Sequence, residues 1–129
     1  EAPRASPDIV ACNTAVHACA RAGLAHEAVA VLERARRAGL RPTVVTFASV
    51  IDACGRAGRS QEALGWLQQM WAEAVIPNSI AFNSAVDAAA RCGDLAGALR
   101  CLEDMATVRL TPDVLSYTAV IRAAAATGQ

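Results

Sequence analysis

The sequence has no lysine, few aromatic residues and no excess of either charge. All 12 basic side chains are arginines, and 12 acidic side chains balance them to a formal net charge of zero. A domain-wide basic field, the usual footprint of a nucleic-acid-binding domain, is therefore absent. The planar guanidinium of arginine suits phosphate groups, so binding to a polyanion would depend on a local stripe of arginines.

The low aromatic content also limits what the core can be made of. Aromatic residues are 4% of the 129 residues, whereas hydrophobic residues reach 54%, so alanine, valine, leucine and isoleucine must fill the core. No apolar run approaches the length that crosses a membrane. The chain starts at Glu1 and shows no signal or transit peptide. We therefore expect a mature protein or a fragment of one, whose compartment cannot be read from a leader.

Motifs of catalysis and metal binding are missing as well. The five cysteines include no Cys-x-x-Cys pair, and neither His17 nor His26 stands at metal-ligand spacing from them. This pattern is typical of small buried thiols in a reducing compartment, not of a disulfide framework or a zinc site. No paired carboxylates and no glycine-rich phosphate loop occur in the sequence. We expect a protein that is not an enzyme and that has no cofactor.

What the sequence does contain is an internal repeat with a period of 35 residues. Four series of identical residues keep this interval in one common register: Pro7, Pro42, Pro77 and Pro112; Gly23, Gly58, Gly93 and Gly128; Ala28, Ala63 and Ala98; Leu32, Leu67 and Leu102. Self-similarity at such a period is the signature of a stack of supersecondary units.

Each unit is predicted to hold two helices. A proline and a possible N-cap (Asp8, Thr43, Asn78 or Asp113) precede the leading helix, and a glycine ends it. A second helix with one apolar face follows within a few residues. The predicted helices span residues 9–22, 25–38, 44–57, 60–74, 79–92, 95–108 and 114–126.

One helix pair cannot bury its apolar face alone, so the units are expected to stack. The leading helices would line a concave inner surface, and the second helices would form the outside. The last unit has no second helix, so Val114, Val120 and Ile121 would lack a cover. We expect that the chain continues or that this helix packs against something else.

The residues also resemble a known family. The stretches VVTF at 44–47, IDACGRAG at 51–58 and VIPN at 75–78 look like one pentatricopeptide repeat. The related tetratricopeptide repeat has a period of about 34 residues and a Trp, Leu-Gly and Tyr signature that is missing here. The resemblance implies an all-α, right-handed α-solenoid of about three and a half repeats. A flank at 1–8 would be followed by repeats at 9–43, 44–78 and 79–113 and a partial repeat at 114–129.

The family binds single-stranded RNA, usually in mitochondria or chloroplasts, with one base read by each repeat. The resemblance implies that a residue in the first turn of the leading helix and one at the repeat junction select the base. These pairs are Asn13 with Thr43, Ala48 with Asn78, and Asn83 with Asp113, and Thr118 has no junction partner. Asn83 with Asp113 implies uracil, Asn13 with Thr43 a pyrimidine and Thr118 a purine, whereas Ala48 should read its base poorly. Apolar residues beside the bases would be Val10, Val45, Ile80 and Leu115.

Arginines also recur at the 35-residue interval. Arg21, Arg56 and Arg91 each stand near the end of a leading helix, where the family is often basic and can approach phosphates. Ala126 interrupts this series in the fourth unit. A structural explanation also exists, because cations are favoured at helix C-termini and the junction residues are ordinary N-caps.

Two functional hypotheses remain open, with a third behind them. The first is an RNA-binding module of an organellar RNA-processing, RNA-stabilising or translation factor, with uracil-containing single-stranded RNA as its partner. The second is a structural solenoid subunit that contacts proteins in a large ribonucleoprotein or other organellar assembly. The neutral charge, Ala48 and Trp71, which is expected to be exposed as a possible protein contact, favour the second. A peptide-binding adapter is the third.

Overall fold

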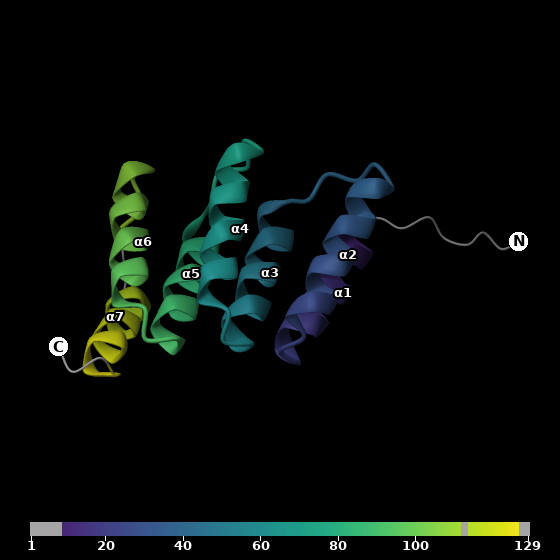
Figure 1. Ribbon diagram of the computed structural model, residues 1–129. Coiled ribbons are helices and arrows are strands. Elements are labelled where there is room, and N and C mark those ends of the chain that lie inside the picture. The colour runs from purple at the N-terminus through teal and green to yellow at the C-terminus, as the bar shows by residue number, and fades with distance from the viewer. Residues whose placement is uncertain (1–8, 112–113, 127–129) are drawn as a thin grey trace, which may run out of the picture.

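A computed structural model describes residues 9–111 and 114–126, without the side chains of 114–116 and 126. Its seven helices each have 13 residues: α1 (Ile9–Arg21), α2 (Ala25–Arg37), α3 (Val44–Arg56), α4 (Ser60–Ala72), α5 (Ser79–Arg91), α6 (Leu95–Thr107) and α7 (Val114–Ala126). Figure 1 shows them side by side in chain order. The predicted ranges are confirmed to within two residues, and the described chain contains no strand.

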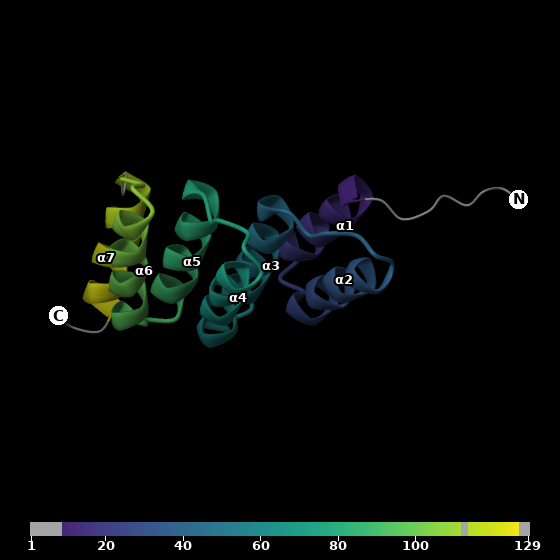
Figure 2. The ribbon, with the colours of Figure 1, turned by 90° about the horizontal axis from the view of Figure 1, so that it is seen from above.

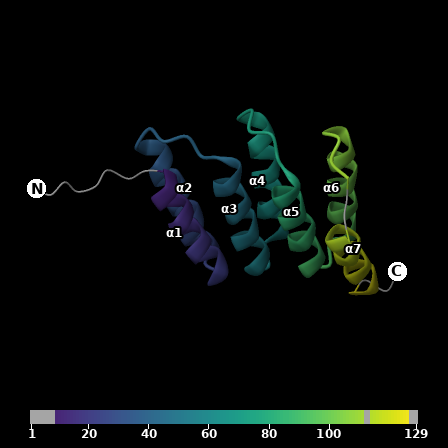
Figure 3. The ribbon, with the colours of Figure 1, turned by 180° about the vertical axis from the view of Figure 1, so that it is seen from behind.

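The helices form two layers. The leading helices α1, α3, α5 and α7 pack against one another in succession, and each second helix packs against the leading helices before and after it. Figure 2 shows the two layers from above, and Figure 3 shows the leading helices from the side opposite to Figure 1. The molecule is an all-α solenoid, and the leading helices make one continuous layer, as expected.

Short polar side chains fix the starts of the described leading helices α3 and α5. The Thr43 hydroxyl interacts with that of Thr46, which in turn accepts a bond from the Thr43 backbone N–H, forming a capping box. Asn78 Oδ1 accepts a hydrogen bond of 3.0 Å from the backbone N–H of Ala81. The other predicted caps, Asp8 and Asp113, lie outside the described residues.

A residue in the left-handed backbone conformation follows each of the helices α1 to α6. Gly23, Gly58 and Gly93 have φ between 72° and 77°, and the N–H of the residue after each bonds back to a carbonyl five residues earlier. This is the Schellman arrangement that glycine permits without a steric penalty. The second helices end in the same backbone conformation at Gly39 but also at two residues that carry a Cβ, Ala74 and Arg109. The fourth predicted glycine, Gly128, lies outside the described residues.

The core runs through all units along the seam between the layers. It is built largely from alanine with aliphatic residues and the two phenylalanines. The small residues allow close helix approach: a Cβ added to Gly55 in α3 would lie 2.6 Å from the Cβ of Ala88 in α5. The prediction that alanine and aliphatic residues fill the core holds for most of its members, but the largest core side chains are Phe47 and Phe82, and Met70 and Met105 are also buried.

The face of α7 that carries Ile121 is less buried than the same face of the preceding leading helices. Ile121 is 67% exposed, whereas Ile51, at the same repeat position in α3, is fully buried. Tyr117 is exposed and Val120 is half-buried. The expectation of an uncovered face on this helix is thus confirmed for Ile121, and the side chain of Val114 lies outside the described residues.

Candidate nucleic-acid interface

One stripe of side chains follows the open face of each leading helix. Its members are three or four residues apart, which places them on one side of a helix. Across the stack they form four rows. The apolar row is Val10, Val45, Ile80 and Leu115. The middle row is Asn13, Ala48, Asn83 and Thr118. The mixed-charge row is His17, Asp52, Asp87 and Arg122. The arginine row is Arg21, Arg56 and Arg91. We call these rows together the leading-helix face.

The apolar row presents aliphatic side chains to solvent. Val10, Val45 and Ile80 are 55% to 70% exposed, although β-branched side chains of this kind usually fill the core. The side chain of Leu115 lies outside the described residues. Exposed aliphatic groups at regular intervals along one face can pack against flat, planar ligands, because such contacts remove apolar surface from water.

A hollow of about 330 Å³ lies on this face where α1, α3 and α5 meet. This volume falls within the range of small-ligand clefts, roughly 300–1,000 Å³. Its lining combines two members of the apolar row with several polar groups: His17, Val44, Val45, Ala48, Ser49, Asp52, Asn78, Ile80 and Ser84. The predicted base-flanking residues Val45 and Ile80 and the predicted selector pair Ala48 and Asn78 therefore share one recess.

The first predicted selector pair is connected through a third residue. Asn13 Oδ1 accepts a hydrogen bond from the hydroxyl of Thr46, and Thr46 also bonds to Thr43 in the capping box. Asn13 lies in α1 and Thr46 in α3, so this bond joins the first unit to the second. Because Thr46 is fully buried, the bond also fixes the orientation of the Asn13 amide. Sequence reasoning did not identify Thr46, since the contact depends on how two helices pack.

The other predicted selectors differ in exposure. Ala48 is buried and has no polar side-chain atom, and the amide oxygen of Asn78 is engaged by the N-cap bond to Ala81. Asn83 is half-buried and Thr118 is exposed. Asp113, the predicted junction partner of Asn83, lies outside the described residues.

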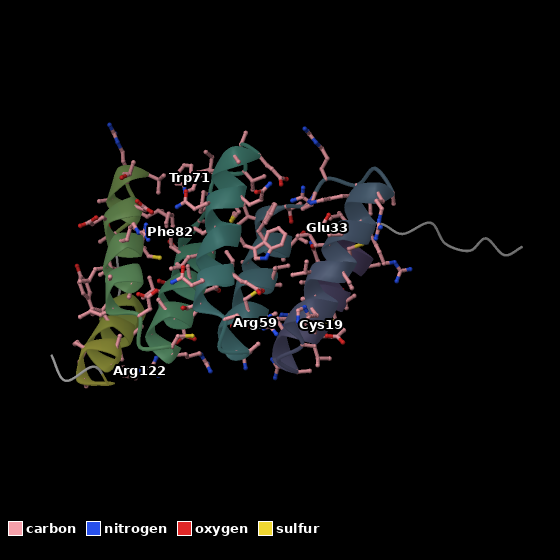
Figure 4. The ribbon with its side chains drawn as sticks, in the orientation of Figure 1. Cys19, Glu33, Arg59, Trp71, Phe82 and Arg122 are labelled. Carbon is pink, nitrogen blue, oxygen red and sulfur yellow. The ribbon has the colours of Figure 1, made fainter. Side chains whose placement is uncertain are left out.

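The arginine row is paired with carboxylates in the middle of the stack. Arg56 Nε lies 3.0 Å from Asp52 Oδ2, and Arg91 Nε lies 2.7 Å from Asp87 Oδ2. Arg122 of α7, which is labelled in Figure 4, reaches the other oxygen of Asp87 at 3.2 Å and so joins two units. Arg21 is exposed, and none of the described residues forms an ion pair with it.

These carboxylates determine the charge of the face. The hydrogen bond that Arg91 donates to Asp87, followed by the charge of Asp87 and, to a smaller extent, that of Asp52, raises the pKa of Arg91 above its usual value. Sequence reasoning missed the mixed-charge row, although two signals pointed to it. Its members recur every 35 residues, and each aspartate stands four residues before an arginine, a spacing at which opposite charges pair on a helix.

Two of the five thiols, those of Cys54 and Cys101, are poorly suited to nucleophilic chemistry. Burial, above all, raises the pKa of Cys54 to about 11 and that of Cys101 to about 12. Within the described residues no cluster of histidine, cysteine, aspartate and glutamate could hold a metal ion. None of the described helices has both the length and the apolar character that a membrane span requires.

The two tryptophans belong to the outer layer. Trp66 packs against the core with its ring 6.2 Å from that of Phe47. Trp71 is half-buried and also packs against the core, on the side of α4 that faces α6 (Figure 4). It is therefore less exposed than the sequence suggested, because its helix position turns partly toward the next unit.

Comparison with known families identifies the fold. A family model described as the pentatricopeptide repeat domain matches residues 5–57 and 61–126. This chain belongs to the pentatricopeptide repeat family. A second model, the PPR repeat, matches residues 45–74 within this pentatricopeptide repeat chain. No curated protein sequence matches it significantly.

Solved pentatricopeptide repeat structures superpose on the chain. The repeat protein PPR10 in complex with an 18-nucleotide psaJ RNA element is 30% identical, with a TM-score of 0.82, over 94% of this chain and 18% of that one. PPR10 from maize gives the same TM-score at 22% identity, over 98% of this chain and 18% of PPR10. The PPR domain of Arabidopsis thaliana protein-only RNase P 1 in complex with tRNA gives 0.80 at 16% identity over 94% and 64%. The chain thus spans about a fifth of the length of PPR10.

Proposed function

We propose that this chain binds single-stranded RNA along the leading-helix face, with one base at each repeat. The observation that carries the proposal is the exposed apolar row beside the hollow, in which Val45 and Ile80 flank a recess lined by polar groups. The flat faces of bases can pack against such aliphatic groups whatever the base, because the contact removes apolar surface from water. The RNA complex of the 30% identical PPR10 supports the same class of ligand.

The base preferences follow from the selector residues. We propose that Asn83 with Asp113 favours uracil, that Asn13 with Thr43 favours a pyrimidine, and that Thr118 favours a purine. The bond from Thr46 to Asn13 Oδ1 leaves the amide N–H groups of Asn13 to face a base. The second unit discriminates least, because Ala48 offers no donor or acceptor.

The setting of this module is also a proposal. Family membership and the RNA-bound PPR10 support a non-catalytic repeat segment of an RNA-processing, RNA-stabilising or translation factor in a mitochondrion or chloroplast. A base stacked on an aromatic side chain gains about 1–3 kcal/mol, so three complete units with an aliphatic row supply at most roughly 3–9 kcal/mol before the cost of ordering the RNA strand. The segment alone should therefore bind with a dissociation constant between about millimolar and micromolar.

A matched pair of substitutions tests the RNA proposal. Ile80→Ser removes an exposed aliphatic group from the leading-helix face, and Leu99→Ser removes one from the outer helix α6; both residues are exposed. We expect Ile80→Ser to weaken binding of labelled oligouridine roughly tenfold in an anisotropy titration, because it removes a stacking contact. Leu99→Ser should bind like the parent chain. Equal affinities for all three, with circular dichroism unchanged, would contradict the proposal.

A structural role in a larger assembly is the second candidate. An outer cleft of about 510 Å³ lies between α2 and α4 and is lined by Trp66 and Arg36 among others. Arg36 pairs with Glu73 across the two units and lies over the ring of Phe47, so the wall of this cleft joins the first unit to the second. About 1 mM is the weakest dissociation constant in the range given above. If the folded chain binds no RNA at this concentration, the protein-contact role gains support.

A further inference from the structure

The charge of the leading-helix face changes along the stack. In the first unit, His17 stands beside Arg21, and no carboxylate shares their stripe. In the second and third units, Asp52 and Asp87 occupy the position of His17, and in the fourth unit Arg122 does so. The arginine row is therefore compensated in the two middle units and uncompensated in the first.

Asp52 and Asp87 lie on the face along which the proposed RNA strand would run. Asp52 lines the hollow on the leading-helix face. Along α3 it stands between Val45 of the apolar row and Arg56, and its carboxylate lies 3.0 Å from the Nε of Arg56. A phosphate that approached Arg56 would meet the negative charge of Asp52 at a similar distance. Since attraction and repulsion of unit charges are equal at equal distance, the carboxylate cancels most of the gain from the arginine.

Asp87 neutralises more than its own repeat. One of its oxygens accepts from Arg91 at 2.7 Å, and the other accepts from Arg122 of α7 at 3.2 Å. Asp52 adds to the electrostatic stabilisation of charged Arg91, which indicates that the carboxylates of adjacent units act on the same arginine. Both aspartates remain about 30% exposed, so a phosphate in the groove would sense them.

We propose that Asp52 and Asp87 are affinity-limiting residues that compete with RNA phosphates for Arg56 and Arg91. This inference rests on the proposed RNA function. It makes the first unit, with Arg21, the main phosphate anchor of the described chain, and it makes the middle units bind through the apolar row and the base contacts. The natural sequence thereby trades affinity for dependence on the bases, because phosphate contacts carry no sequence information.

The test is an oligouridine titration of the chain and of Asp52→Asn/Asp87→Asn at several salt concentrations. The amide is nearly isosteric with the carboxylate, so the helices should be retained. We expect the double variant to bind roughly five- to tenfold more tightly at low salt, given the modest strength of exposed ion pairs. Each freed arginine should steepen the slope of log affinity against log salt by about 0.7.

The matched control changes the same net charge elsewhere. Glu33→Gln/Glu103→Gln removes two exposed carboxylates from the outer helices α2 and α6 and should leave the affinity and the salt slope near those of the parent. Restoring the balance with Arg56→Ala in the Asp52→Asn background should return the affinity toward the parent value. Conversely, His17→Asp should lower it.

The outcomes separate this inference from the function on which it rests. If the parent binds and Asp52→Asn/Asp87→Asn shows the same affinity and slope, the aspartates only stabilise their helices and the inference is wrong. If Glu33→Gln/Glu103→Gln gains affinity to the same extent, the gain comes from the change in net charge alone, and the inference is also wrong. If neither the parent nor the double variant binds oligouridine, the proposed function falls as well.

Discussion

The thiol of Cys54 is fully buried in α3, and its sulfur lies 3.9 Å from a carboxylate oxygen of Glu62. Burial, with the charge of Glu62, raises its pKa from 9.0 to about 11. Below pH 9 the thiol is protonated in both the folded and the unfolded chain. Between pH 9 and 11 the unfolded chain releases this proton while the folded chain keeps it. Ionisation therefore stabilises the unfolded state, and the free energy of unfolding falls as the pH rises toward 11.

We therefore expect the free energy of unfolding to fall between pH 9 and about pH 11. Chemical denaturation at a series of pH values measures this fall. Cys54→Ala should make it shallower, and the substitution is mild because Ala89 occupies the same repeat position in α5 and is also buried. If the variant and the parent lose stability in parallel, ionisation of Cys54 does not contribute.

At the same scale, sequence reasoning found some residues of the candidate site and missed others. The apolar row was implied by the resemblance to pentatricopeptide repeats, and the 35-residue interval placed its members at the same position in each unit. The pairing of Arg56 with Asp52 was also accessible from the four-residue spacing. The bond between Asn13 and Thr46 joins residues 33 positions apart, and only the packing of α1 on α3 brings them together.

At the scale of the element, the turns after α4 and α6 carry a backbone strain that the turn after α2 avoids. Gly39, Ala74 and Arg109 occupy the same repeat position, with φ of 83°, 60° and 63°. A side chain in this left-handed region costs roughly 1–2 kcal/mol, and glycine removes that cost but gains entropy in the unfolded chain. We expect Ala74→Gly to stabilise the fold by about 0.5–1 kcal/mol.

Urea unfolding with an unchanged m-value measures this effect, and the reverse substitution is its control. Gly39→Ala places a Cβ in the same backbone conformation and should destabilise the chain by about 1 kcal/mol. An added Cβ meets no atom within 4 Å at Gly39, so a steric clash does not complicate the comparison. Loss of stability in Ala74→Gly would show that the turn is not strained.

The helices themselves were predictable because prolines and glycines mark their ends. The predicted end of α4 at residue 74 differs most from the structure, which ends the helix at Ala72. No glycine marks that turn, and the residues around it contain no other signal for the left-handed backbone conformation at Ala74. The equivalent turn after α6 also lacks glycine and has Arg109 instead, yet the predicted end of α6 differs from the structure by one residue, so the missing glycine alone does not account for the error at α4.

At the scale of the whole molecule, stability comes from stacking, so one residue type has different effects at different places in the stack. The sequence predicted the two layers because a single amphipathic pair cannot bury its own apolar face. It did not predict how the ion pairs cross between units, such as Arg36 with Glu73 and Arg122 with Asp87. Those contacts depend on the rotation between adjacent repeats, which repeat spacing alone does not specify.

The same substitution at two equivalent positions measures the contribution of stacking. Ile51 in α3 is fully buried and Ile121 in α7 is 67% exposed, although both stand at one repeat position. Ile51→Ala should cost about 2–5 kcal/mol, because it removes buried methyl groups and leaves a cavity, whereas Ile121→Ala should stay within about 0.5 kcal/mol. Chemical denaturation at two protein concentrations checks both values. If Ile121→Ala is as costly as Ile51→Ala, the outer face of α7 is covered in solution, and a dependence on protein concentration would identify a second copy of the chain as the cover.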